Sequence, residues 1–406
     1  MPITSASPRG MSRNQLRILI AGLVLLVTAA GNSPAQTYQV IHNFSSTDGS
    51  GPFAGLTLDA AGNLYGTTGY GGSHGCGNVF KLSPHGSSWV LNQLYSFQGD
   101  TDGCEPAARV VFGPSGILYG SNFDTIFSLR PPPNRPTSVL SPWMLTTLYT
   151  FGYPYDTGEY PTGDVIFDST GNLYGAAEFG GIQNQDCYSG CGTIFELSPS
   201  GGGNWTESTL YSFTDSPDGS NPVGVIFDSA GDILGPTSAG GGHSGGMLFE
   251  LSRSGSGWTE SRLHAFDYQD GAAPAAGLVA DSAGNYYGSA GTAIFELSPS
   301  NGGWTYTVLY NLPESYDGWP TAPLTLDAAG NIYGTINGYC QLCPGAIFKL
   351  TNTSGGWTFT SLHDFTGGDD GSHPSSTVLF DAAGNAYGTS SWGGTHGEGV
   401  VWEITP

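Results

Sequence analysis

The sequence predicts an all-β fold, a seven-bladed β-propeller, from three observations. The phrase Asp-x-x-Gly-Asn-x-Tyr-Gly, or a close variant of it, occurs seven times in 406 residues. A period of about 46 to 60 residues with strand-like segments between turns is typical of propeller blades. The two ends of the chain also supply complementary parts of one repeat, which predicts a closed ring. The copies of the phrase centre on Gly62, Gly116, Gly171, Gly231, Gly284, Gly330 and Gly384.

Residues 1–35 differ from the rest of the chain. Three arginines precede an apolar run at 18–30, and small residues follow at 33–35. This order predicts a secretory signal peptide that is cleaved after Ala35. The apolar run is shorter than the roughly 20 residues that span a bilayer. We therefore expect a secreted or periplasmic protein with no stable membrane insertion, in which residues 36–406 form a single propeller domain.

The first repeat shows how a blade is built. Gly62 and Asn63 tolerate positive φ and predict a turn between the first two strands, and Ser83-Pro84 predicts another turn between the last two. Nothing between these turns has a helical pattern, so the repeat predicts four antiparallel strands. The expected strands are 56–58, 64–68, 78–82 and 89–97.

Large aromatic residues recur at two positions of the repeat. Each ring can bury about 150 to 250 Å², so we predict that they pack between blades and do not bind ligands. The third-strand position holds Phe80, Phe127, Phe195, Phe249, Phe295, Phe348 and Trp402. The second-strand position holds Tyr65, Tyr119, Tyr174, Tyr287, Tyr333 and Tyr387, with Leu234 in the fourth repeat.

The two ends of the chain predict ring closure. Residues 38–44 match the fourth-strand phrase at 94–97, whereas residues 400–404 form a third strand with no fourth strand after it. The N-terminal strand is therefore expected to complete the last blade. Such closure removes an unpaired strand edge between the first and last blades.

These residues resemble a known repeat family. The unit Gly-Leu-Thr-Leu-Asp59-Ala-Ala-Gly-Asn-Leu-Tyr-Gly-Thr-Thr68, followed by Leu-Tyr-Ser-Phe97-x5-Gly-x2-Pro106, is similar to the bacterial GloVer-type tandem repeat over residues 38–406. The resemblance implies export and implies no established activity. Members of that family carry varied C-terminal surface anchors. This chain ends within its last blade, so a soluble secreted form is expected. The core phrase is more distantly similar to NHL-type propeller repeats, which are mostly binding platforms.

Composition limits the class of partner. The formal net charge is −23, yet charged residues make up only 11% of the chain. A chain this acidic repels nucleic acid and anionic membranes. The remaining surface chemistry is neutral, polar and aromatic, which favours a glycan or an extracellular protein as the partner. We expect a monomer.

Function is expected on the face that carries the variable loops. In an antiparallel blade, the loops from strand two to three and from strand four to the next strand one share a face, which we call the loop-rich face. All six cysteines fall in these loops, and export allows them to form disulfides. The predicted pairs are Cys76 with Cys104, Cys187 with Cys191 and Cys340 with Cys343. The alternatives are a zinc site, which needs pairs from distant blades to meet, and a thioredoxin-like Cys340-x-x-Cys343 site, which lacks the usual following helix.

An aspartate recurs in the loops that lead from the fourth strand into the next blade. A ring of carboxylates on one face could attract calcium or hydroxyl-rich ligands. The alternative is that each Asp-Gly step starts a turn that proline then stiffens. No cofactor other than calcium is expected. The aspartates are Asp48, Asp102, Asp156, Asp218, Asp270, Asp317 and Asp370.

Two kinds of candidate site residue remain. His74, His373, His396 and Glu398 lie in loops of the last and first blades and would suit a general base with an acid or metal partner in a lyase or hydrolase. Trp319 and Trp392 lie outside the repeated tryptophan positions and are candidates for ligand stacking. The leading hypothesis is a binding scaffold that uses the loop-rich face. The alternatives are the lyase or hydrolase and a structural or adhesive repeat.

Overall fold

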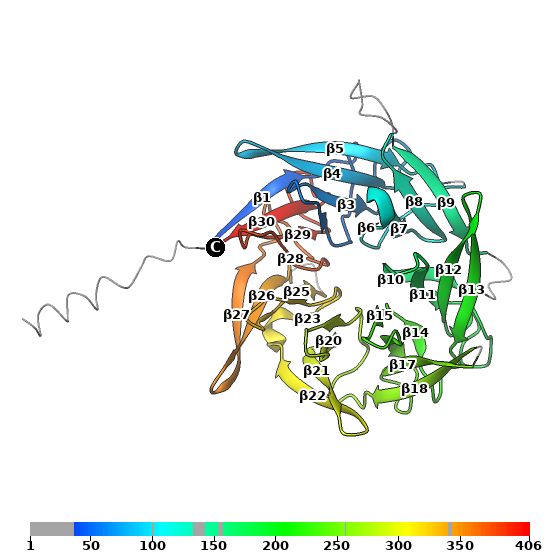
Figure 1. Ribbon diagram of the computed structural model, residues 1–406. Coiled ribbons are helices and arrows are strands. Elements are labelled where there is room, and N and C mark those ends of the chain that lie inside the picture. The colour runs from blue at the N-terminus through cyan, green and yellow to red at the C-terminus, as the bar shows by residue number, and fades with distance from the viewer. Residues whose placement is uncertain (1–35, 100, 133–142, 153–156, 256, 340–342) are drawn as a thin grey trace, which may run out of the picture. The chain divides into compact units, whose positions relative to one another are not determined.

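The computed structural model describes residues 36–99, 101–132, 143–152, 157–255, 257–339 and 343–406. Tyr38–Thr405 form one compact unit. Within this unit, seven small antiparallel sheets follow one another around a ring, which confirms the predicted seven-bladed propeller (Figure 1). The predicted signal peptide lies outside the described residues. Within the described ranges, no helix has the length and apolar character needed to cross a membrane.

Blades 1 to 3 share one strand order, in which consecutive strands pair from the ring centre outward. Blade 1 has β2 (Thr57–Leu58), β3 (Leu64–Thr68), β4 (Asn78–His85) and β5 (Ser88–Ser96). Blade 2 has β6 (Val111–Phe112), β7 (Leu118–Ser121), β8 (Thr125–Arg130) and β9 (Met144–Thr150). Blade 3 has β10 (Glu159–Phe167), β11 (Leu173–Phe179), β12 (Thr193–Gly201) and β13 (Asn204–Ser212).

Blades 4 to 6 keep this order, but the innermost strand of blades 4 and 6 is split into two segments. Blade 4 has β14 (Ser220–Pro222), β15 (Ile226–Phe227), β16 (Ile233–Ala239), β17 (Met247–Ser254) and β18 (Gly257–Ala265). Blade 5 has β19 (Val279–Ala280), β20 (Tyr286–Ala290), β21 (Ala293–Ser300) and β22 (Gly303–Asn311). Blade 6 has β23 (Gly318–Trp319), β24 (Thr325–Leu326), β25 (Ile332–Gly338), β26 (Ala346–Thr353) and β27 (Gly356–Asp364).

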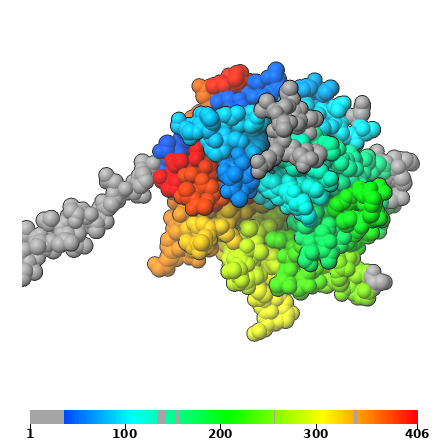
Figure 2. All heavy atoms as spheres, turned by 45° about the horizontal axis from the view of Figure 1, so that its top comes forward, coloured from blue at the N-terminus to red at the C-terminus, as the bar shows by residue number. Residues whose placement is uncertain are grey.

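Blade 7 joins the two ends of the unit. Its strand order is β1-β30-β29-β28, so the N-terminal strand completes the last blade as predicted. The Nε2 atom of Gln39 donates to Glu403 Oε2 over 2.5 Å, and the backbone N–H of Phe44 donates to Gly399 over 3.0 Å. In the space-filling view the blades follow one another in chain order until the ends of the colour range meet (Figure 2). The strands of this blade are β28 (Leu379–Phe380), β29 (Ala386–Ser390), β30 (Val400–Thr405) and β1 (Thr37–Asn43).

The repeated aromatics form the core between blades, as predicted. All seven third-strand rings are fully buried, and the second-strand tyrosines are buried except for Tyr287, which is half-buried. The glycine after each second-strand tyrosine makes room for the third-strand ring. A Cβ on Gly66 would lie 2.6 Å from the ring of Phe80, and a Cβ on Gly388 would lie 2.2 Å from Trp402. The glycine of the Tyr-Gly step therefore recurs because a side chain at this position would clash with the third-strand ring. The step also closely follows the residues that form the turn.

The Asp-x-x-Gly-Asn phrase forms the predicted turn between the first two strands. In blade 1, Gly62 has φ +81°, and the carboxylate of Asp59 accepts hydrogen bonds from two backbone N–H groups, at Ala61 and Asn63, both over 2.9 Å. It also accepts from Asn63 Nδ2 over 2.7 Å and from the Tyr65 hydroxyl over 3.1 Å. One carboxylate thus links the turn to the second strand, which explains why Asp, Asn and Tyr recur together.

The predicted turn at Ser83-Pro84 is wrong. Pro84 lies within β4 and pairs with Trp89, and the strand continues to His85. On its other side, β4 pairs with β3 only as far as Leu82. Beyond that residue β4 has a free edge, where the missing N–H of proline costs no ladder hydrogen bond.

Candidate functional site

A recess on the loop-rich face combines two aromatic side chains with polar groups from blades 6 and 7. Its volume is about 310 Å³, and its lining includes Trp319, Thr321, Asn337, Tyr339 and His373. The Trp319 and Tyr339 rings lie 4.2 Å apart with 45° between their planes. The tryptophan singled out from the sequence therefore lies in a formed cavity. We call this cavity the Trp319 recess.

Local backbone geometry holds the two rings together. A 3₁₀ turn over Glu314–Tyr316 ends at Asp317, whose φ is +45°. The carbonyl of Asp317 accepts a hydrogen bond from the Tyr339 N–H over 2.8 Å. A Cβ on Gly318 would lie 2.1 Å from the Asn337 carbonyl oxygen, so only glycine allows β23 to approach β25 this closely.

The polar groups of the recess suit a neutral ligand. The Nδ2 atom of Asn337 donates to Thr321 Oγ1 over 3.4 Å, while its Oδ1 atom is buried without a partner in the described part of the chain. Burial lowers the pKa of His373, which favours the neutral imidazole. The backbone N–H of His373 donates to Pro344 over 2.7 Å, and its carbonyl accepts from Ser391 Oγ over 3.0 Å, which fixes the residue in place. An unpaired amide oxygen beside a neutral imidazole can accept hydrogen bonds from hydroxyl groups.

A larger cavity of about 1160 Å³ is lined by the innermost strand segments of several blades. Small residues such as Gly55, Ala108 and Gly224 line it, and Thr321 lines both this cavity and the Trp319 recess. Within it, Arg109 Nη2 lies 2.7 Å from Asp164 Oδ2, an ion pair that joins blades 2 and 3. The sequence signal for this cavity is the set of small residues at the starts of the innermost strands.

The four histidine and glutamate candidates occupy different surroundings. Only His373 among them lines the Trp319 recess. Glu398 accepts hydrogen bonds from Ser46 Oγ over 2.7 Å and from Ser50 Oγ, and these bonds lower its pKa. In the described ranges, no hydrogen bond or ion pair joins His74, His373 or His396 to Glu398, although the charge of His396 acts on it. The contacts of Glu398 connect the loop before β30 to the loop after β1.

Trp392 is 56% exposed on the same face. Its backbone forms an antiparallel bridge with Ser372, with hydrogen bonds of 2.8 and 3.2 Å. Trp392 therefore pairs with the residue that directly precedes His373 in the sequence. It is absent from the lining of the Trp319 recess.

The loop aspartates accept hydrogen bonds within their own blades. Asp102 accepts from the Tyr95 hydroxyl over 2.7 Å, and Asp218 accepts from the Tyr211 hydroxyl over 2.8 Å. In three other blades a histidine takes the place of the tyrosine, and its Nε2 atom lies 2.8 to 3.2 Å from the aspartate. Asp317 ends the 3₁₀ turn before Trp319, and Asp156 lies outside the described residues. A cation bound at one of these paired aspartates would compete with the bonds that hold its turn. The histidine pairs are His42 with Asp48, His264 with Asp270 and His363 with Asp370.

Two of the predicted disulfides are confirmed. Cys76–Cys104 joins the β3–β4 loop to the loop that enters blade 2, and Cys187–Cys191 closes a short loop in blade 3. Cys343 is also disulfide-bonded, and its predicted partner Cys340 lies outside the described residues. The zinc alternative needed the thiolates of Cys187 and Cys191 together with those of Cys340 and Cys343, and the Cys187–Cys191 disulfide removes the first two of these ligands.

The comparison with protein families confirms the repeat. The model of the family described as Gloeobacter/Verrucomicrobia repeat matches residues 125–293, from blade 2 to blade 5. These residues are a GloVer-type repeat. No curated protein matches the sequence.

Solved structures share the fold at low identity. Two are extracellular domains described as belonging to hybrid two-component systems of B. thetaiotaomicron, with TM-scores of 0.55 and 0.56 and identities of 15% and 12%. They cover 93% and 91% of this chain, which spans only 42% of each of theirs. A gluconolactonase from Xanthomonas campestris has a TM-score of 0.42 and 12% identity, and the alignment covers 77% of this chain and 89% of that one. At these identities, the first two structures support the propeller fold and nothing about function. The TM-score of the third is too low to support a conclusion about this chain.

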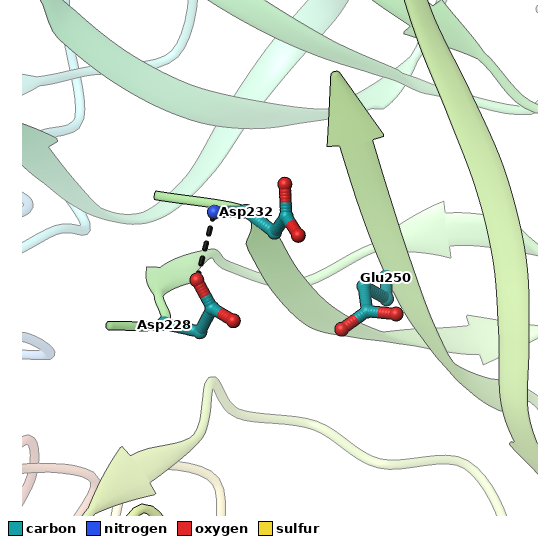
Figure 3. A group of neighbouring side chains, drawn as sticks. All are labelled: Asp228, Asp232 and Glu250. Atoms are coloured by element: carbon teal, nitrogen blue, oxygen red, sulfur yellow. Dashed lines mark hydrogen bonds between the residues drawn. The ribbon is translucent and has the colours of Figure 1, made fainter. Parts of the chain in front are cut away.

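Blade 4 departs from the GloVer-type repeat and gathers three carboxylates on the face opposite the recess. Oxygen atoms of Asp228, Asp232 and Glu250 lie within 4.8 Å of one another (Figure 3). In this blade Asp232 replaces the repeated Asn and Leu234 replaces the repeated Tyr, so two usual donors to the aspartate are missing. Burial, and then the charges of Asp232 and Asp228, raise the pKa of Glu250. Carboxylates in this arrangement could hold a divalent cation, and the substitution at position 232 is the sequence signal for it.

Proposed function

We propose that this protein is an exported propeller that binds a neutral, hydroxyl-rich ligand, a glycan segment, in the Trp319 recess. The observation that carries the proposal is the pair of rings formed by the half-buried Trp319 and the exposed Tyr339, which lines the same recess as the Asn337 amide, whose buried Oδ1 atom has no partner in the described residues. Sugar rings present apolar C–H faces that stack on aromatic rings and hydroxyl groups that donate to amide oxygens. The recess offers both kinds of contact within one cavity.

The size and charge of the recess fit this ligand class. A cavity of about 310 Å³ lies at the lower end of the range for small-molecule sites, which suits one or two sugar units of a longer chain. None of its lining residues is a carboxylate, a lysine or an arginine. A charged ligand would have no counter-ion there, whereas a neutral one needs none.

Export is supported by two features. The disulfides of blades 1 and 3 are typical of proteins that fold in oxidising compartments. The leader at 1–35 has the order of segments found in signal peptides. A glycan of the cell envelope or of the surroundings is therefore within reach of the protein.

The first test is a thermal-shift screen of the purified protein against neutral oligosaccharides of glucose, galactose, mannose and N-acetylglucosamine. At least one of them should raise the melting temperature in a saturable way, and Asn337→Ala should abolish that shift. Tyr188→Ala removes an aromatic that is 84% exposed elsewhere on the loops, so this control should keep the shift. If no oligosaccharide binds, or if the two variants behave alike, the glycan proposal is wrong.

The same screen separates binding from catalysis. His373 is the candidate base that lines the recess, so the hydrolase or lyase alternative predicts turnover of a bound oligosaccharide. That turnover would disappear in His373→Ala. A binding scaffold predicts unchanged oligosaccharide after long incubation.

A further inference from the structure

A second recess, between blades 2 and 3, combines aromatic rings with carboxylates at the large cavity. Glu105, Phe123, Tyr160 and Glu178 all line this cavity. The Tyr160 ring lies 4.2 Å from that of Phe123 at 64°, and 6.2 Å from that of Phe179 at 86°. Phe123 is 40% exposed, whereas the third-strand rings of the repeat are fully buried. We call this group of five residues the blade 2–3 recess.

The negative charge of the blade 2–3 recess is unmatched. Burial, followed by the charges of Glu105 and Glu178, raises the pKa of Tyr160, so both carboxylates act on the same ring. Neither carboxylate forms a hydrogen bond or an ion pair with any residue in the described ranges. Arg109, the basic residue that lines the cavity, is already paired with Asp164. A cation could therefore enter without displacing an existing partner.

The walls of the recess are held in place before any ligand arrives. The N–H of Glu105 donates to the Cys76 carbonyl over 3.1 Å, and the N–H of Phe123 donates to the Cys104 carbonyl over 3.0 Å. The two cysteines whose carbonyls accept these bonds are joined by a disulfide, so one crosslink fixes the backbone beside both Glu105 and Phe123. Glu105 and Tyr160 have φ values of +57° and +64°, a backbone conformation that costs energy in residues other than glycine and is often found at ligand sites.

We propose that the blade 2–3 recess binds the ammonium group of a small organic cation. The faces of Tyr160 and Phe123 attract a cation through their quadrupoles, and the effect is largest for alkylated ammonium groups that shed water easily. Glu105 and Glu178 supply the counter-charge. The excess of acidic residues in the chain as a whole also raises the local concentration of cations. This site is made by other blades than the Trp319 recess and takes a ligand of different charge.

The test is a calorimetric titration with choline, compared with its neutral isostere in which carbon replaces the ammonium nitrogen. Choline should bind at least about tenfold more tightly than the isostere, because only choline carries the charge. Glu178→Gln and Glu105→Gln should each weaken choline binding by about five- to tenfold. Glu314→Gln removes the same charge from an exposed turn in blade 6 and should leave choline binding unchanged.

Several results would overturn the proposal. Equal binding of choline and its isostere would show that charge plays no part. A loss in Glu314→Gln equal to the loss in Glu178→Gln would show a general effect of net charge. No detectable choline binding to the folded wild-type protein would remove the site. Trp319→Ala should leave choline binding intact, so failure of the glycan proposal and failure of this one give different results.

Discussion

Removing the turn aspartate should cost far more stability in blade 6 than in blade 4, although the two positions are equivalent in the repeat. In blade 6 the Asp327 carboxylate accepts from the N–H groups of Ala329 and Asn331, both over 2.9 Å. It also accepts from Asn331 Nδ2 over 2.6 Å and from the Tyr333 hydroxyl over 3.0 Å. In blade 4 the Asp228 carboxylate accepts two backbone bonds, both over 2.8 Å.

The magnitude follows from counting these bonds and charges. A net contribution of about 0.5–1 kcal/mol per bond gives a loss of about 2–4 kcal/mol for Asp327→Ala. Two bonds give a loss of about 1–2 kcal/mol for Asp228→Ala. Removing Asp228 also relieves its repulsion with Asp232 and Glu250, which offsets on the order of 0.5–1 kcal/mol. The net cost in blade 4 is therefore about 0–1.5 kcal/mol by the same count.

The assay is denaturant unfolding of both variants at pH 7 in buffer with EDTA, which keeps divalent cations away from the carboxylates of blade 4. Asp232→Asn is the matched control because it restores the repeat residue, and it should raise stability. Equal losses in Asp327→Ala and Asp228→Ala would refute this account of the turn. A loss of stability in Asp232→Asn would refute the account of repulsion in blade 4.

The remaining predictions concern the fourth strands, the long disulfide and ring closure. Burial lowers the pKa of His42, His264 and His363 in the folded protein against the opposing effect of their aspartates, so the unfolded chain binds protons more readily. Their contribution to stability is therefore present above a pH of about 6.5 and is lost as the pH falls through the lower folded values. Replacing all three by tyrosine, the residue of other blades, should flatten the pH dependence of unfolding between about pH 5 and 7; an unchanged profile would contradict this. Replacing Cys76 and Cys104 by alanine opens a crosslink with a sequence separation of 28 residues and should cost about 3–4 kcal/mol in denaturant unfolding; a loss below about 1 kcal/mol would contradict the entropic estimate. Deleting β1 should leave β30 with a free edge and cause self-association in light scattering, and a stable monomeric deletion variant would show that the strand is dispensable.

The ring of blades was predictable because variants of the same sequence phrase occur seven times along the chain. Most blades present the same Asp-x-x-Gly-Asn turn, and every blade buries a large ring at the third-strand position, so seven weak signals reinforce one another. The match of residues 38–44 to a fourth strand also predicted closure. The structure confirms this prediction, because β1 pairs with β30. The one local error, at Ser83-Pro84, arose because proline usually marks a turn, whereas here it lies beyond the end of the neighbouring strand.

The recesses were only partly predictable because their residues come from loops that do not repeat. Trp319 was singled out since it breaks the tryptophan pattern, but nothing in the sequence places Tyr339 or the Asn337 amide beside it. Their proximity depends on the close approach at Gly318 and on a turn with positive φ at Asp317. This geometry depends on the pairing of β23 with β25 within blade 6, which the repeated pattern did not predict.

The blade 2–3 recess had no sequence signal of its own. Glu105 and Tyr160 belong to different blades, and neither sits in a recognisable motif. The acidic group of blade 4 did have a signal, the replacement of Asn by Asp232 in the repeated phrase. Its effect appears only when the third-strand residue Glu250 is placed beside it, which requires the register of β16 and β17.

The most direct test of the proposed glycan site is a calorimetric titration of the tightest-binding neutral oligosaccharide into the wild type and into Trp319→Ala. The loss of a stacking ring from the recess should raise Kd by at least about tenfold, while Tyr188→Ala leaves Kd unchanged. An unchanged Kd in Trp319→Ala would place the glycan elsewhere and contradict the proposed function.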